Sequence, residues 1–407
     1  MVNRLWCEAA IPILWRKPWY YAINYRNKVS LFSIITSYLS NDVKEFLTEK
    51  GIKVSNQSLV FDYLSFCKSI NINVIDDIIS IESSTEYHRF ILKEEIYSFL
   101  IKKCTEIKYL NICGTYMLTY LPEAKVHLES LCELTCNTWE DRFDEMNDDE
   151  PMEDPYTEIF EILKKHAITL NHFEISLQLY SDKNYTVIHF SILEFYNLKT
   201  LKISSPVPLS TFKFDEKLET VVYRNLEIFE VDSTYIYQVT CMIKNSPYLR
   251  ELRIHDYILD DNEFNDDTLN LIRVINENCF LIEHLSIPVF PLLENHLTEF
   301  GKLLKKCQKL RLLQFRKGYY EEGKELEFGE NLLDVLARET STSLRRIEIS
   351  HYIIFSLKAF ETFLEKWKGQ PAITILMDEF YFCQNDDSYK KLISKYKNEG
   401  VIKDINM

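Results

Sequence analysis

The segment 318–325 reads Gly-Tyr-Tyr-Glu-Glu-Gly-Lys-Glu and has the G-x-x-x-x-G-K spacing of a phosphate-binding loop. Such a loop needs Ser or Thr after the lysine to bind magnesium, and surroundings that accept phosphate. Here Glu325 follows the lysine, and Glu321 and Glu322 would repel phosphate inside the loop. We therefore interpret the segment as an ordinary loop rather than a nucleotide site.

Two other groups of residues are of the types that bind metals. Cys132 and Cys136 lie four residues apart with His127 nearby, but a zinc site needs further ligands at close spacing. The acidic stretch 140–154 lacks the ligand order and central glycine of a calcium-binding loop. We expect buried, reduced thiols and a flexible acidic insertion, and no cofactor or metal.

Catalytic motifs are also missing from the sequence. It contains neither H-E-x-x-H nor G-x-S-x-G, and its nine histidines are scattered without an evident nucleophile beside a base. The sequence therefore favours a protein that is not an enzyme.

Composition narrows the classes of partner. The 407 residues are 46% hydrophobic, so the chain can bury a large core. A net charge of −15 disfavours binding to nucleic acids and to anionic membranes. No run of eighteen apolar residues is present, so we expect no membrane-spanning helix. We expect a monomer located in the cytoplasm, the nucleus or both.

One short pattern recurs along the chain: apolar, two residues, apolar, one residue, apolar. The last two apolar positions are spaced as in a β-strand, and helix-period stretches separate the copies. Clean copies start at Ile107, Leu170, Leu198, Leu249, Ile282, Leu310 and Leu344, and weaker ones near Leu128, Leu218 and Ala372. The helical stretches include the apolar sets Leu293, Leu297, Phe300 and Leu304, and Leu357, Phe360, Leu364 and Trp367. Each repeat is therefore a strand followed by a helix, and stacking buries both.

Cys104, Cys279 and Cys307 each precede the first apolar position of a copy by three residues. With this cysteine the repeats resemble leucine-rich repeats of the cysteine-containing form. The resemblance implies an α/β repeat solenoid, with parallel strands on the concave face and helices outside.

The predicted organisation has four parts. Residues 1–20 are followed by a helical region, 21–104, with helices expected at 29–39, 43–49, 59–67 and 88–104. Repeats are expected over 105–385, interrupted by the acidic insertion 140–154. A lysine-rich helix over 386–407 is expected to cap the last repeat.

The N-terminal residues resemble the second half of an F-box through Val2, Trp6, Ala9, Leu14 and Trp15. With the repeats, they resemble fungal F-box proteins that carry leucine-rich repeats. We expect the F-box to be truncated, because its first half, a Leu-Pro segment and a helix, has no counterpart here. The resemblance implies the substrate-recognition subunit of an SCF-type ubiquitin ligase. The residues that would contact a Skp1-like adaptor are Leu5, Trp6, Ile11, Leu14 and Trp15.

Two alternatives stay open. These N-terminal residues are equally expected to pack on the helical region and contact no partner. The chain would then be a protein-interaction module without coupling to a ligase. In both cases the sequence does not identify the bound protein.

Side chains between the strand leucines are expected to line the concave face. The predicted binding residues there are Glu251, Arg253, His255, His284, Ser286, Gln314, Arg316, Arg346 and Glu348. Their cations suggest a local positive stripe that would steer an acidic partner. Ordinary solvated strand positions are the simpler interpretation.

Overall fold

The structure is a computed structural model that divides the chain into two compact units, Met1–Phe195 and Tyr196–Met407, called unit 1 and unit 2 below. It describes residues 4–20, 25–113, 128–138, 163–165, 167–177, 186–205, 212–255, 257–258, 264–291, 293–316, 323–349, 353–377 and 387–406. The acidic stretch 140–154, His127 and residues 318–322 lie outside these ranges.

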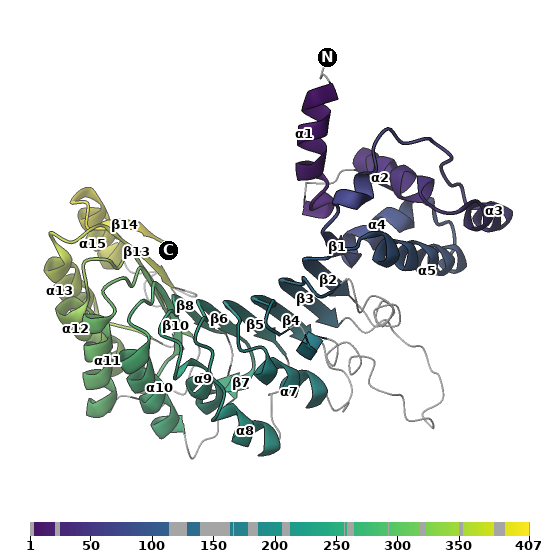
Figure 1. Ribbon diagram of the computed structural model, residues 1–407. Helices are drawn as coiled ribbons and strands as arrows, with labels where there is room; N and C mark the ends of the chain where they lie inside the picture. Colours follow the sequence, from purple (N-terminus) through teal and green to yellow (C-terminus); the bar gives the residue numbers. More distant parts are fainter. Residues whose placement is uncertain are drawn as a thin grey trace. The chain divides into compact units, whose positions relative to one another are not determined.

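Unit 1 begins with helices and continues with short parallel strands, paired in the order β1-β2-β3-β4 (Figure 1). Its elements are α1 (Arg4–Leu14), η1 (Pro18–Tyr20), α2 (Tyr25–Ser37), α3 (Asn41–Glu49), η2 (Tyr63–Phe66), β1 (Ser69–Asn71), α4 (Ile72–Glu82), α5 (Glu86–Lys103), β2 (Tyr109–Cys113), β3 (Glu133–Thr138), β4 (His172–Leu177) and α7 (Thr186–Glu194). Ser40, Asn71 and Thr85 begin α3, α4 and α5, because each side-chain oxygen accepts a hydrogen bond from a first-turn N–H.

The segment after α1 protects the first strand of unit 1. The buried Trp19 donates its indole N–H to the carbonyl of Ser69 at 2.7 Å, and Lys68 N donates to Arg16 O at 3.0 Å. Lys17 Nζ lies 3.2 Å from the centre of the Tyr109 ring. An uncovered edge strand is open to unwanted pairing, so these contacts stabilise the beginning of the sheet.

The helical region of unit 1 differs from the prediction in three places. Residues 59–67 contain only the short 3₁₀ turn η2, and α4 was not predicted. Strand β1 lies inside the range predicted to be all-helical, so the strands begin before residue 105. Its sequence, Cys67-x-x-Ile70-x-Ile72, follows the repeat pattern with a cysteine in the first apolar position.

Among the repeats of unit 1, the weak copy predicted near Leu128 starts instead at Leu131, which precedes β3.

Unit 2 is a series of strand-and-helix repeats. Its elements are β5 (Thr200–Ser204), α8 (Phe212–Leu218), β6 (Ile228–Val231), β7 (Thr234–Tyr235), α9 (Ile236–Ile243), β8 (Glu251–Ile254), β9 (Tyr257–Ile258), α10 (Phe264–Asn278), β10 (His284–Pro288), α11 (Glu294–Lys306), β11 (Leu312–Arg316), α12 (Glu325–Glu339), β12 (Arg346–Ile349), α13 (Leu357–Trp367), β13 (Ile373–Met377), α15 (Asp387–Asn398) and β14 (Ile402–Ile405). The main sheet is parallel throughout, in the order β5-β6-β8-β10-β11-β12-β13-β14.

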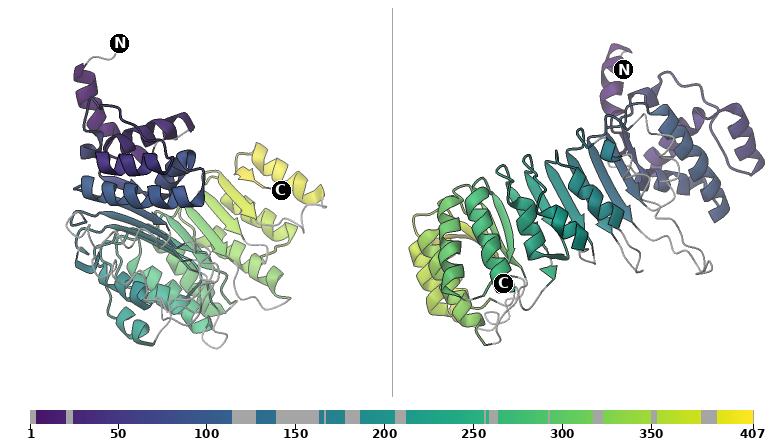
Figure 2. Two further views of the ribbon diagram at one scale, coloured as in Figure 1. Left: turned by 90° about the vertical axis from the view of Figure 1, so that its right-hand side faces the viewer. Right: turned by 60° about the horizontal axis from the view of Figure 1, so that its bottom comes forward.

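The helices of unit 2 stack side by side on one face of this sheet, its outer side, and the strands line the inner side (Figures 1 and 2). Leu198, Leu249, Ile282, Leu310 and Leu344, which start the copies, are all buried. The next two apolar residues of each copy face the helices, because strand side chains alternate. Apolar burial along this layer is the main force that holds the repeats together.

The repeat cysteines are buried where a helix ends and the next strand begins. Cys307 N donates to Leu303 O at the end of α11, and Cys279 N donates to Ile275 O at the end of α10. Burial raises the pKa of the Cys279 thiol to about 12 and that of Cys307 to about 11. Both therefore stay protonated at neutral pH, as inert apolar groups.

Unit 2 corrects three further expectations. The weak copy near Leu218 starts instead at Leu226, just before β6. The C-terminal range 386–407 contains the expected helix, α15, and also the strand β14, which pairs with β13. Leu293 is 46% exposed and precedes α11, whose buried face is formed by His296, Phe300, Gly301, Leu303 and Leu304. No helix in the described ranges is long and apolar enough to cross a membrane.

His296 is a buried polar side chain between α11 and α10. Its Nε2 donates to Asn265 O at 3.0 Å and lies 3.1 Å from Thr268 Oγ1, and Nδ1 is buried without a hydrogen-bond partner. Burial, the largest cause, lowers the pKa of His296, and Arg273 adds to the effect. The folded chain therefore holds a neutral imidazole here.

This burial predicts acid sensitivity. The unfolded chain protonates His296 more readily, so the free energy of unfolding is expected to fall as pH drops through about 6.5, the ordinary histidine pKa. His296→Gln keeps a donor for Asn265 O but does not titrate. Urea unfolding at pH 7.5 and 5.5 should show a smaller loss of stability for this variant. Equal losses in both proteins would mean that other groups cause the acid sensitivity.

Candidate protein-binding face

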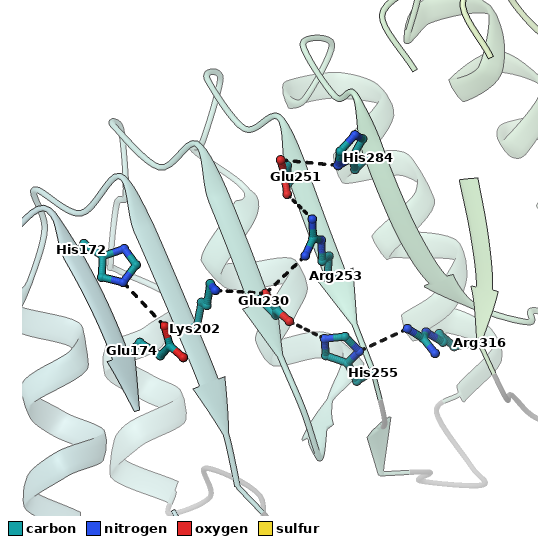
Figure 3. Close-up of polar contacts among 9 residues, drawn as sticks. All are labelled: His172, Glu174, Lys202, Glu230, Glu251, Arg253, His255, His284 and Arg316. Carbon is teal, nitrogen blue, oxygen red and sulfur yellow. Dashed lines mark hydrogen bonds and ion pairs between the residues drawn. The ribbon is translucent and has the colours of Figure 1, made fainter. Parts of the chain in front are cut away.

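The inner face of the unit 2 sheet, opposite the helices, carries the predicted binding residues and is called the open face below (Figure 3). Strands β8, β11 and β12 alternate buried and solvent-accessible positions, and the accessible ones carry Glu251, Arg253, Gln314, Arg346 and Glu348. Neighbouring strands are in parallel register, so polar side chains of successive repeats form rows across the sheet.

Glu230 on β6 is the centre of an ion-pair network that the sequence analysis did not predict (Figure 3). Its carboxylate lies 3.8 Å from Lys202 Nζ, 3.7 Å from an Arg253 Nη and 2.7 Å from His255 Nε2. All of these side chains are partly exposed, so each pair contributes modestly to stability. The main effect is to fix the side-chain positions on β5, β6 and β8.

Arg253 lies between two carboxylates. Besides Glu230, it contacts Glu251 at 2.6 Å, and Glu251 lies 3.4 Å from His284 Nδ1 (Figure 3). The predicted local positive stripe is therefore absent from β8 and β10. Cations and carboxylates alternate there instead, and Arg253 is already paired within the chain.

His255 and Arg316 approach each other across strand β10 (Figure 3). His255 Nε2 donates to Glu230, which leaves Nδ1 to accept from Arg316 Nη2 at 3.4 Å. Ser286 on β10 is only 1% exposed, and its hydroxyl donates to Ile254 O at 3.1 Å. The prediction that Ser286 is exposed on this face is therefore wrong, since its short hydroxyl is buried against the β8 backbone.

On β11 and β12 the predicted residues also contact one another. Arg346 lies 2.5 Å from Glu348, and Gln314 donates to the same carboxylate. The register explains this contact, because Gln314 is directly opposite Glu348.

A further set of charged residues was missed. We call this set the entry row. Each member follows the first apolar residue of a copy and directly precedes the strand. The members are Lys199, Glu227, Arg250, Glu283, Arg311 and Arg345. Its ion pairs are Lys199–Glu227 at 3.5 Å, Arg250–Glu283 at 3.9 Å and Arg311–Glu283 at 4.0 Å. The repeat position itself could have revealed this row, because one charged residue occupies it in every copy from Leu198 to Leu344.

Of the residues that resemble an F-box, Val2 lies outside the described ranges, and the others lie on α1 or directly after it. Leu5, Trp6 and Leu14 are 73%, 69% and 48% exposed, and Ile11 is partly buried. Trp15 packs against Tyr63 of η2, with ring centres 4.8 Å apart. The structure thus separates the five residues: most of α1 is accessible to a partner, whereas Trp15 makes an internal contact.

In the part of the chain that the structure describes, no three His, Cys, Asp or Glu side chains lie together in a group that could bind a metal ion. Cys136 is fully buried on β3, which raises the pKa of its thiol to about 12.

The fold and the open face define an α/β repeat protein with a solenoid like that of leucine-rich-repeat proteins. No protein-family model and no curated protein matches the chain. Among solved structures, it is similar to a chain in the crystal structure of the Rad7 and Elc1 complex in yeast. The TM-score is 0.43 and the identity 14%, covering 91% of this chain and 88% of that chain.

Proposed function

We propose that this chain is a non-enzymatic protein-binding subunit of the cytoplasm or nucleus. In this proposal the open face binds a protein substrate, and α1 docks on a Skp1-like adaptor of an SCF-type ubiquitin ligase. The observation that carries the adaptor role is the exposure of α1, in which no residue is buried. Exposed clusters of large apolar side chains commonly mark protein interfaces.

Four apolar side chains of α1 are arranged as a docking face. At 100° per residue, Leu5, Ala9, Ile13 and Trp6 fall on one side of the helix, and the predicted contacts Ile11 and Leu14 fall outside this face. Arg4 and Glu8, which form an exposed ion pair at 2.8 Å, lie on the other side. Leu5 and Ile13 are both more than 70% exposed. Burying two such side chains in an interface contributes about 3 kcal/mol or more.

The adaptor role predicts that Leu5→Asp/Ile13→Asp weakens binding of a purified Skp1-like adaptor about a hundredfold, the equivalent of about 3 kcal/mol. Isothermal titration calorimetry with the full chain measures this loss. The matched control, Arg4→Glu/Glu8→Arg, keeps the ion pair and the apolar face, and should bind like the unchanged chain. An adaptor that does not bind the unchanged chain, or that binds all three proteins equally, contradicts the adaptor role.

A second candidate is a protein-interaction module without ligase coupling. One observation favours it: Trp15 and Trp19 use their rings to pack on η2 and to hydrogen-bond beside β1. Part of the segment that resembles an F-box thus covers the start of the sheet. Partner binding at the open face together with absent adaptor binding would support this candidate.

A further inference from the structure

Charge is distributed unevenly over the open face and its entry row. On and beside β5, β6, β8 and β10, five carboxylates face four cations among the described residues. The cations are Lys199, Lys202, Arg250 and Arg253, and the carboxylates are Glu227, Glu230, Asp232, Glu251 and Glu283. On β11 and β12 four arginines accompany a single carboxylate, Glu348. These four, Arg311, Arg316, Arg345 and Arg346, are called the arginine cluster.

In the entry row, the alternation of opposite charges ends between β11 and β12. Opposite charges alternate from Lys199 to Arg311, and then Arg311 is followed by Arg345 on the next strand. The two are direct neighbours, because Arg345 N donates to Arg311 O at 2.9 Å. Like charges at such a spacing repel each other, and a bound anion would remove this cost.

The contacts of Arg311 and Arg345 leave both guanidinium groups available to bind an anion. Among the described residues, Arg345 donates only to backbone carbonyls, those of Thr342 at 2.6 Å and Leu344 at 2.9 Å. Arg311 shares Glu283 with Arg250, at 4.0 Å, and its side chain is 67% exposed. Neither contact is the bidentate carboxylate pairing that a guanidinium favours.

Arg316 extends the cluster along β11. Its Nε is buried without an acceptor, and its Nη2 contacts the His255 ring. Among the described residues no carboxylate lies within 4.0 Å of it. Between these arginines, Leu312 is half-buried on the open face, directly opposite Arg346.

We propose that the arginine cluster binds an acidic segment of a partner protein, with its carboxylates on Arg311 and Arg345 and an aliphatic side chain over Leu312. This inference rests on the proposed function, and it adds the chemistry of the bound segment. Charge complementarity on a chain of net charge −15 favours such a segment over a nucleic acid, which would meet the carboxylates of the neighbouring strands.

Fluorescence anisotropy with a labelled peptide of repeated Glu-Glu-Leu-Ser units tests the proposal, next to the same peptide with Gln in place of Glu and a thymidine oligonucleotide. We expect the acidic peptide to bind more tightly than the other two. Arg311→Glu/Arg345→Glu should weaken its binding at least about tenfold, since two charge-assisted contacts become repulsive. The matched control, Lys302→Glu/Lys366→Glu, changes the net charge equally at exposed side chains of α11 and α13, on the helix side of the sheet. It should stay within about twofold, because physiological salt screens charges beyond roughly 8 Å.

Equal loss in both variants would overturn the proposal, since binding would then depend only on net charge. Equal binding of the Gln peptide, or tighter binding of the oligonucleotide, would also overturn it. The assay contains no adaptor, so its failure is distinguishable from failure of the ligase role, which the α1 variants test.

Discussion

Replacing Gly329 with alanine is expected to destabilise unit 2 by about 3 kcal/mol, the upper part of the usual range for overpacking. Gly329 is buried in α12, where the chain segment after β12 passes against the helix. A Cβ here would overlap the carbonyl oxygen of Ile354 and lie 2.8 Å from its carbonyl carbon. These are backbone atoms, so no side-chain rotation removes the clash. The segment around Ile353 and Phe355, both buried, would have to move.

A second helical glycine provides the control. Gly301 is buried in α11, but a Cβ there would meet side chains at ordinary contact distance, those of Glu339 at 3.4 Å and Val335 at 3.8 Å. Gly301→Ala should therefore be neutral or stabilise by up to about 1 kcal/mol, through the higher helix propensity of alanine. Urea unfolding of the two variants should give opposite signs. If both variants are destabilised, the overlap with the Ile354 carbonyl is not what distinguishes the two glycines, and the prediction is wrong.

The repeat pattern predicted the fold correctly because every copy must place apolar residues at the same positions, where stacking buries them. Leu198, Leu249, Ile282, Leu310 and Leu344 each precede an observed strand of unit 2. Each first leucine is buried, and the next two apolar residues face the helices. A period set by burial is visible in the sequence, as long as the copies keep leucine or isoleucine in these places.

The elements that were missed depart from this period for local reasons. Strand β1 has Cys67 at the first apolar position, and β14 pairs with β13 through an irregular register. The apolar residues of β14, Ile402 and Ile405, are three apart, which does not indicate a strand. Residues 59–67 look helical by apolar spacing, but only η2 forms there.

The candidate site was predictable in its residues but not in its contacts. Alternation correctly places Arg253 and Glu348 on one face, yet their partners depend on the register between strands that are distant in sequence. Glu230 was not recognised, because its weak copy was assigned a start at Leu218 instead of Leu226. Ser286 shows the limit of alternation: a short side chain becomes buried where Arg316 reaches toward His255 across its strand.

The aromatic cluster under β10 and β11 is expected to show the largest loss of stability on truncation. Phe300 of α11 is fully buried, and its ring centre lies 5.3 Å from Phe290 and 5.8 Å from Phe315. Phe290 in turn contacts Phe328 of α12 at 5.6 Å. One aromatic cluster therefore joins β11 to α11 and α12, the helices that precede and follow it in the chain.

Phe300→Ala should reduce the free energy of unfolding by about 3–5 kcal/mol, because it removes buried apolar area and leaves a cavity among aromatic rings. Since repeats stabilise one another through their neighbours, the loss should concentrate around β11, the strand that carries Arg311 and Arg316. Hydrogen exchange should therefore accelerate in α11, β11 and α12 more than in α9. Phe280→Ala, at a residue that is 49% exposed, is the control and should change stability by less than about 1 kcal/mol. Uniform acceleration over unit 2 would instead show that its repeats unfold as a single cooperative block.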